Sequence, residues 1–274
     1  MEIKTLPPPT VTCFGLIIDE PKKKVGEIPS PIISIVLIHN KADEPNEDGS
    51  HGKPAGWGLP GGGKDDKRDK DCLAAAIFEV EEEAGIVAEL ATRFPTEYGE
   101  VLRVQKPYCN NTVLIFHLAK VGDGGRIEYK ETGSRSICSL ADILLMSLAV
   151  NKKTGKIEPF GIYFSHRKYI FIALGRMGID FMKAIPDLPE LLEKRSEEEL
   201  RAEWGDEVYD ILANAVLEND IRVAESGNPC CETDVYVIGE EYFAPPIGTD
   251  EIILKKGGAD NTDWRIWAEA NFPS

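Results

Sequence analysis

The chain has 274 residues, 42% of them hydrophobic, which is enough to bury one large domain or one domain with a smaller companion. Its formal net charge is −16, whereas binding to nucleic-acid phosphates or to an anionic membrane surface needs basic patches. We therefore expect neither nucleic acid nor membrane as a partner. A polyphosphate could still bind, provided that metal ions and local Arg or Lys residues mediate the contact.

Six cysteines occur in the chain, and no CxxC pair is present. Four of the six lie inside apolar or helical runs, where buried thiols are common. We therefore expect a reducing, cytoplasmic location with neither a disulfide framework nor a zinc site. The first residues, MEIKTLPPP, lack the apolar core of a signal peptide, and no run approaches the length of a membrane span. The cysteines are Cys13, Cys72, Cys109, Cys138, Cys230 and Cys231.

Apolar and β-branched runs predict six strands in the first half of the chain. They are expected at residues 10–18, 31–39, 57–59, 86–90, 97–105 and 111–119. The run PIISIVLIH at 31–39 is continuous, which is typical of a strand buried on both faces. Residues 1–9 precede these strands as a polar, proline-rich arm that we expect to be extended.

Helical periodicity is clearest between residues 73 and 84, where apolar side chains recur at three- and four-residue steps. Asp69 or Asp71 can cap the N-terminus of this helix, and Gly85 suits the left-handed residue just beyond its end. Later segments are predicted as strand and loop at 127–137, as a short helix at 140–150 and as helix at 188–221.

Three carboxylates on the first helix are the strongest candidates for chemistry. Glu79, Glu82 and Glu83 stand at i, i+3 and i+4 and therefore share one face, whereas Glu81 lies well round the helix and is expected in solvent. A hard divalent cation such as Mg²⁺ or Mn²⁺ would turn their mutual repulsion into binding, because all three donors are carboxylates. For an acidic helix taken alone, the alternative is a solvated charged face.

The stretch from Gly56 to Ile86, GWGLPGGGKDDKRDKDCLAAAIFEVEEEAGI, resembles the Nudix box. That pattern runs Gly, five residues, Glu, seven residues, then Arg-Glu-apolar-x-Glu-Glu-x-Gly-apolar. Residues 79–86 match its second half at every defined position, and residues 58–62 match the usual lead-in. The resemblance implies an α/β fold, a Nudix-like α/β/α sandwich around a mixed β-sheet, over residues 10–180. Residues 181–274 exceed that fold, and we expect a mostly helical extension that covers the domain, shapes specificity or builds a homodimer.

The box has two departures from the pattern. Phe78 stands at the position of the arginine, Lys70 stands at the position of the first glutamate, and the linker between them and the glycines is one residue longer than usual. In the family these two groups orient the metal-binding glutamates. Asp69 or Asp71 can replace the missing carboxylate if the linker bulges. Loss of such supporting groups typically costs about 10–100-fold in metal affinity or activity.

The resemblance implies Mg²⁺- or Mn²⁺-dependent hydrolysis of a phosphoanhydride bond in a nucleoside diphosphate linked to another moiety. Glu79 and Glu83 are then metal ligands, and Glu82 is a ligand or the base that activates water. A backbone carbonyl near Gly61 or Gly62 can also reach the metal. Two later loop residues are further candidates for the general base, Glu128 and Glu131. The alternative is a nucleotide-binding or regulatory module that has lost turnover.

Residues 160–174, FGIYFSHRKYIFIAL, are the aromatic and basic stretch of this acidic chain. One interpretation is a core helix or strand with an exposed basic edge. The other is a wall of the substrate pocket, in which Tyr163 or Phe164 stacks on a base and Arg167 or Lys168 meets a phosphate.

The four histidines do not form a metal-ligand set in the sequence. His39 and His117 lie inside apolar strands and are expected to be core residues. His51 and His166 have no partner that the sequence identifies.

Overall fold

The computed structural model describes residues 8–19, 33–43, 53–91, 99–106, 110–124, 132–151 and 154–225. Two predicted segments lie outside the described residues: most of the N-terminal arm and the chain after residue 225. The two candidate bases of the later loop, Glu128 and Glu131, also lie outside them.

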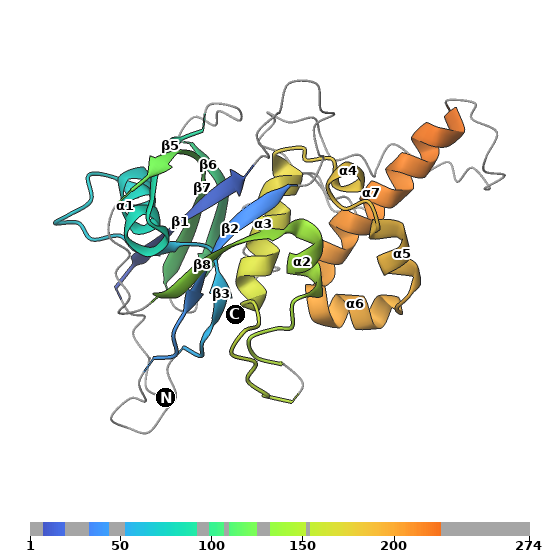
Figure 1. Ribbon diagram of the computed structural model, residues 1–274, viewed down its shortest axis with the longest axis horizontal. Coiled ribbons are helices and arrows are strands. Elements are labelled where there is room, and N and C mark those ends of the chain that lie inside the picture. Colours follow the sequence, from blue (N-terminus) through green and yellow to red (C-terminus); the bar gives the residue numbers. More distant parts are fainter. Residues whose placement is uncertain are drawn as a thin grey trace, which may run out of the picture.

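One sheet runs through the described part of the chain (Figure 1). Its strands are β1 (Thr10–Asp19), β2 (Ser34–Asn40), β3 (Gly56–Gly58), β4 (Gly61–Gly63), β5 (Ile86–Leu90), β6 (Glu100–Lys106), β7 (Asn111–Asp123) and β8 (Thr132–Ser139). The path β3-β2-β1-β7-β5 forms its spine, while β4 pairs with β1, β6 with β7 and β8 with β2. Strands β1 and β7 are parallel and the other pairs are antiparallel, which confirms the predicted mixed sheet.

Helices cover both faces of this sheet (Figure 1). They are α1 (Cys72–Ala84), α2 (Leu140–Leu145), α3 (Phe164–Arg176), α4 (Phe181–Ala184), α5 (Leu188–Glu193), α6 (Glu197–Trp204) and α7 (Asp206–Glu225). Helix α1 lies on one face, α2 and α3 lie on the other, and α4 to α7 pack outside α3. This arrangement confirms the predicted α/β/α sandwich with a helical extension. Among the described residues, no helix combines the length and apolar character needed to span a bilayer.

Strand β1 shows how the alternating side chains of a strand build two cores. Cys13 and Ile17 join the cluster under α1, together with Val80 of that helix. Phe14 and Leu16 point the other way, into the cluster shared with α2 and α3. Two-sided burial was predicted for residues 31–39, and β2 confirms it, because Ile35 and Leu37 lie in one cluster and Val36 and Ile38 in the other.

The helices of the extension share the second core with the sheet. Leu200, Trp204 and Val208 belong to the same buried cluster as the strand residues. The indole Nε1–H of Trp204 donates to the carbonyl of Leu144 at 3.1 Å, which joins α6 to the end of α2. Helices α6 and α7 therefore pack against the rest of the domain through this shared core. The domain boundary predicted at residue 180 stays a prediction.

Gly15 of β1 lets helix α1 approach the sheet closely. A Cβ at this position would lie 2.3 Å from Cγ2 of Val80 and 3.0 Å from Cδ1 of Leu118. We expect Gly15→Ala to lower the free energy of unfolding by about 1–3 kcal/mol, because overpacking forces the helix or its side chains to shift. Urea denaturation measures this loss. In a double-mutant cycle with Val80→Ala the loss should shrink, and an equal loss in both backgrounds would contradict the contact.

Candidate functional site

Helix α1, which carries the three glutamates, is fixed at both ends. The side chain of Asp71 accepts the backbone N–H of Ala74 at 2.8 Å, so Asp71 is the N-cap of the two residues considered. Gly85 has φ 61° and ends the helix in the left-handed conformation, as predicted. Arg135 of β8 donates to the carbonyl of Ala84 at 2.6 Å, which satisfies one of the free carbonyls of the last turn.

The glycine-rich loop is held between β1 and α1. Its residues 61–63 form β4, which pairs antiparallel with β1. A Cβ on Gly61 would lie 2.3 Å from the carbonyl oxygen of Cys13, so the two backbones approach too closely for any side chain there. The N–H of Gly61 donates to Oε2 of Glu83 at 2.7 Å. The loop and the acidic face of the helix are therefore in direct contact.

The three glutamates are partly buried, whereas Glu81 is exposed as predicted. Oε1 of Glu79 accepts a hydrogen bond from Arg68 at 2.9 Å, and Oε2 lies nearest to the Cα of Gly62, 2.6 Å from where a Cβ would stand. Burial raises the pKa of Glu79, the ion pair with Arg68 opposes that rise, and the charge of Glu82 adds to it. Arg68 is therefore the neighbouring cation that favours the charged form of Glu79.

The donors of this face fit a hard divalent cation by their chemistry, because they are carboxylate oxygens beside a glycine backbone. Among the described residues, however, no three His, Cys, Asp or Glu side chains converge closely enough to hold a metal ion. Oε1 of Glu79 is engaged with Arg68, and Oε2 of Glu83 is engaged with the N–H of Gly61. The three glutamates would have to converge more closely to bind an ion, so the metal site stays a prediction.

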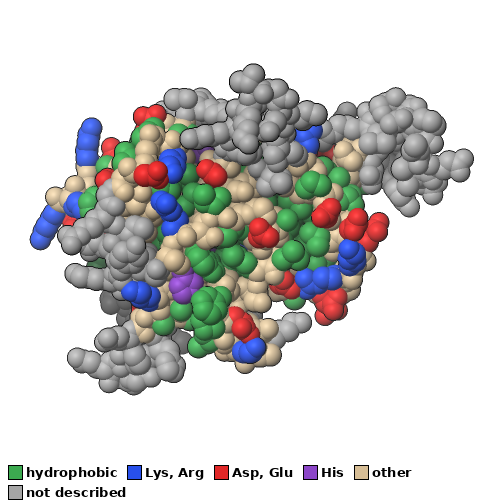
Figure 2. All heavy atoms as spheres, in the orientation of Figure 1, with side chains coloured by type: hydrophobic (Ala, Val, Ile, Leu, Met, Phe, Trp, Pro, Cys, Tyr) green, Lys and Arg blue, Asp and Glu red, His purple; other side chains and the backbone are tan. Residues whose placement is uncertain are grey.

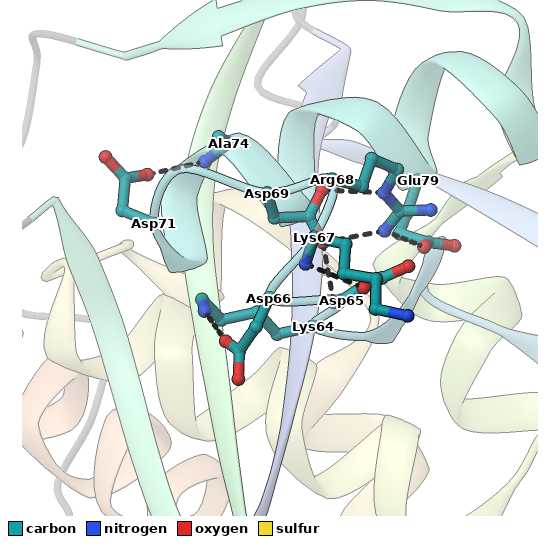
Figure 3. Close-up of polar contacts among 9 residues, drawn as sticks. All are labelled: Lys64, Asp65, Asp66, Lys67, Arg68, Asp69, Asp71, Ala74 and Glu79. Carbon is teal, nitrogen blue, oxygen red and sulfur yellow. Dashed lines mark hydrogen bonds and ion pairs between the residues drawn. The ribbon is translucent and has the colours of Figure 1, made fainter.

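A charged network that the sequence reading did not assign lies beside Glu79 (Figure 3). Arg68 donates from Nε to Oδ1 of Asp69 at 2.6 Å and from Nη2 to Oδ2 at 2.8 Å. The same Nη2 donates to Oε1 of Glu79. Asp69 is buried and also accepts the N–H of Asp65 at 2.8 Å. The guanidinium carbon of Arg68 lies 3.9 Å from the ring centroid of Phe78.

Asp69 is therefore the buried carboxylate of the linker. Lys70 is exposed, and Asp71 is used as the helix cap. Of the two residues predicted to replace the missing carboxylate, Asp69 is the buried one and pairs with Arg68, and its role toward the glutamates stays a prediction. The sequence did contain a signal for Arg68, which is an arginine in a linker one residue longer than usual and directly before Asp69.

The structure corrects the predicted phosphate contacts of Arg167 and Lys168. Arg167 is fully buried in α3 and donates to the carbonyls of Glu203, at 2.9 Å, and Met146. Burial lowers its pKa to about 10. The ammonium of Lys168 pairs with the buried carboxylate of Glu207 at 2.5 Å. Both cations face partners inside the protein because α3 is covered by α6 and α7, so neither wall-forming role is supported.

Tyr163 lies at the N-terminus of α3 and is partly buried. Its hydroxyl donates to the carbonyl of Pro54 at 2.6 Å, and the ammonium of Lys53 lies 4.7 Å from its ring centroid. Burial raises the pKa of this phenol. The predicted stacking of Tyr163 on a base stays a prediction.

His166, to which the sequence gave no role, supports the start of the glycine loop. Its Nδ1 accepts the backbone N–H of Leu59 at 2.8 Å, and a Cβ on Gly58 would lie 2.6 Å from the same nitrogen. The imidazole must be neutral at Nδ1 to accept this bond. Burial lowers the pKa of His166 to about 3, which agrees with that requirement.

We expect His166 to make the protein less stable in acid by about 2 kcal/mol between pH 7 and pH 5. The unfolded imidazole, with a pKa of 6.5, takes up a proton in this range, whereas the folded one does not. The contribution is therefore complete above about pH 6.5 and declines as the pH falls toward 3. His166→Asn, whose Oδ1 can accept the same N–H, should remove this part of the slope in denaturant titrations. A slope equal to that of the wild type would contradict the assignment.

No family model matches the sequence, and no curated protein matches it. Among solved structures, the chain is similar to the NUDIX domain of NrtR from Shewanella oneidensis complexed with ADP ribose, with 14% identity and a TM-score of 0.42. That alignment covers 65% of this chain and 94% of that one. An ADP-ribose pyrophosphatase from Streptococcus suis has 17% identity and a TM-score of 0.36, covering 61% of this chain and 90% of its own. The MutT protein from Methanosarcina mazei has 16% identity and a TM-score of 0.37, covering 65% and 99%. These similarities concern the fold and assign no activity by themselves.

Proposed function

We propose that this protein hydrolyses a phosphoanhydride bond in a nucleoside diphosphate linked to another group, with Mg²⁺ or Mn²⁺ as cofactor. One observation carries the proposal: a helix face with Glu79, Glu82 and Glu83 lies directly against a glycine backbone. Glu83 contacts the N–H of Gly61, and Glu79 packs on Gly62. Carboxylates and side-chain-free backbone at one place suit a diphosphate that arrives with divalent ions.

Each part of this face has a distinct task in the proposed reaction. When bound, a divalent ion neutralises the charges of the diphosphate and lowers the pKa of a water molecule. Glu79 and Glu83 would hold the ion, and Glu82 would serve as a third ligand or accept a proton from the water. A Cβ on Gly63 would meet no atom within 4 Å, so the end of β4 leaves room for a phosphate. The carbonyl of Gly62 remains a candidate ligand.

A second candidate function is a nucleotide-binding or regulatory module without turnover. The observation that favours it is the lack of three convergent acidic side chains among the described residues. Phe78 and Lys70, which replace the arginine and the first glutamate of the box, favour it as well. Such a module would still bind a nucleotide but would lack a bound, correctly oriented ion.

A substrate panel separates the two candidates. The purified full chain is incubated with nucleotide sugars, ADP-ribose, dinucleotides and nucleoside triphosphates in the presence of Mg²⁺ or Mn²⁺. The proposal expects chromatography to show a phosphorylated nucleoside product from at least one compound, and no product after chelation with EDTA. Calorimetric binding without product would decide for the second candidate. Neither product nor binding would contradict both.

A further inference from the structure

We propose that Arg68 is a positioning residue that holds the carboxylate of Glu79 for ion binding. The proposal rests on the proposed function of the acidic face. Position 78, next to Glu79 on the helix, carries a phenylalanine and cannot supply a hydrogen-bond donor. The donor comes instead from the linker before the helix, ten positions earlier in the chain (Figure 3).

The orientation of Arg68 is fixed by Asp69. Two N–H groups of the guanidinium bond the two carboxylate oxygens of Asp69, and this fork allows only one relative plane. Asp69 is itself fixed, because it is 6% exposed and accepts the N–H of Asp65. The bond to Arg68 holds the pKa of Asp69 below its usual range, so the pair stays charged at neutral pH.

Phe78 also supports the guanidinium of Arg68. Its ring is 39% exposed, so it does not serve the core of the sandwich, and the guanidinium of Arg68 lies over it. An arginine on an aromatic face is held by its attraction to the ring. Phe78 therefore acts as a platform for an arginine that arrives from the linker, at the point where the box would place an arginine of its own.

Arg68 contacts Glu79 through one of the two carboxylate oxygens. Nη2 of Arg68 bonds Oε1, and both oxygens of Glu79 lie close to Gly62, Oε2 at 2.6 Å and Oε1 at 3.0 Å from where a Cβ would stand. Arg68 thereby holds one oxygen of a carboxylate that lies against the glycine loop. Loss of Arg68 would remove this bond and leave the carboxylate of Glu79 free to rotate.

The test is Mn²⁺ binding to the full chain, followed by electron paramagnetic resonance of the free ion. We expect Arg68→Ala to weaken binding by about 10–100-fold, the usual effect of losing a group that orients a ligand. Arg68→Lys should lie in between, because an ammonium cannot form the fork with Asp69. The double variant Arg68→Ala/Phe78→Arg should regain part of the affinity, since its guanidinium starts beside Glu79.

Lys67→Ala is the matched control. It removes the same charge from the neighbouring residue, whose side chain is exposed and whose backbone N–H donates to Asp65. Its Mn²⁺ affinity should stay within about two-fold of the wild type, because an exposed charge is screened by solvent. An equal loss in Lys67→Ala and Arg68→Ala would reduce the effect to net charge and overturn the positioning role.

The outcomes separate this inference from the proposed function. A wild-type protein that binds no Mn²⁺ would overturn the proposed function itself. Wild-type binding that is unchanged in a folded Arg68→Ala variant would overturn the role of Arg68 alone. If circular dichroism shows that Arg68→Ala does not fold, Phe78→Ala, which removes only the platform, carries the test. Wild-type affinity in that variant would then overturn the proposal.

Discussion

Replacing Glu83 with Gln is expected to reduce nucleotide hydrolysis by more than about 100-fold, the upper end of losses seen for groups that only orient a ligand. The amide oxygen of Gln can still accept the N–H of Gly61, so the loop should keep its contact with the helix. What is lost is the negative charge that holds a cation. The expected result is therefore a folded protein with normal melting temperature and very little turnover, measured as product release under saturating Mg²⁺.

Glu81→Gln is the control for this experiment. Glu81 is on the same helix but exposed, and removing its charge should change the rate by less than about two-fold. Glu82→Gln should also reduce turnover strongly, whether Glu82 is a ligand or the base. If hydrolysis survives in both Glu82→Gln and Glu83→Gln, the assignment of the site to this helix face is wrong.

Arg167→Ala is expected to lower the free energy of unfolding by about 3–5 kcal/mol. Arg167 is fully buried and satisfies two backbone carbonyls, those of Met146 and Glu203. The change removes two charge-assisted hydrogen bonds, leaves both carbonyls without this donor and opens a cavity between α3 and α6. Equilibrium unfolding in urea, followed by circular dichroism, gives the value.

An exposed cation of the helical extension, Lys194, is the control for Arg167. Lys194 pairs with Glu190 on α5, and both side chains are about two-thirds exposed, at 68% and 66%. Lys194→Ala should cost less than about 0.5 kcal/mol, as exposed ion pairs do. A loss below about 1 kcal/mol in Arg167→Ala would show that its hydrogen bonds do not anchor the extension.

Sequence patterns within a few residues of one another correctly predicted helix α1 and its two ends. The apolar period of α1, its cap and Gly85 are all set within about four residues, and each was found where expected. Strand β7 shows the limit of this reading. Its end at Asp123 lies beyond the predicted residue 119 and past Gly122. Pairing with β5 through an irregularity near Val87 extends the strand past that glycine.

The errors at the site have a common physical cause, which is partners distant in sequence. The carbonyls that receive the guanidinium of Arg167 are 21 and 36 residues away, so a basic residue beside aromatics looked like a ligand of phosphate. Arg68 reaches Glu79 across 11 positions of an irregular linker. No helical or strand period relates those two residues, and only the path of the linker brings them together.

The central strand pair also determines when this acidic face can form as the chain folds. Thr10 of β1 lies opposite Asn111 of β7, so the pairing closes a loop of roughly one hundred residues. Strand β4 rests on β1, and α1 packs against β1 and β5. Because such long-range closure is slow, the glutamates gain their support late, and in refolding experiments the ion uptake that we propose should lag behind the far-ultraviolet helix signal.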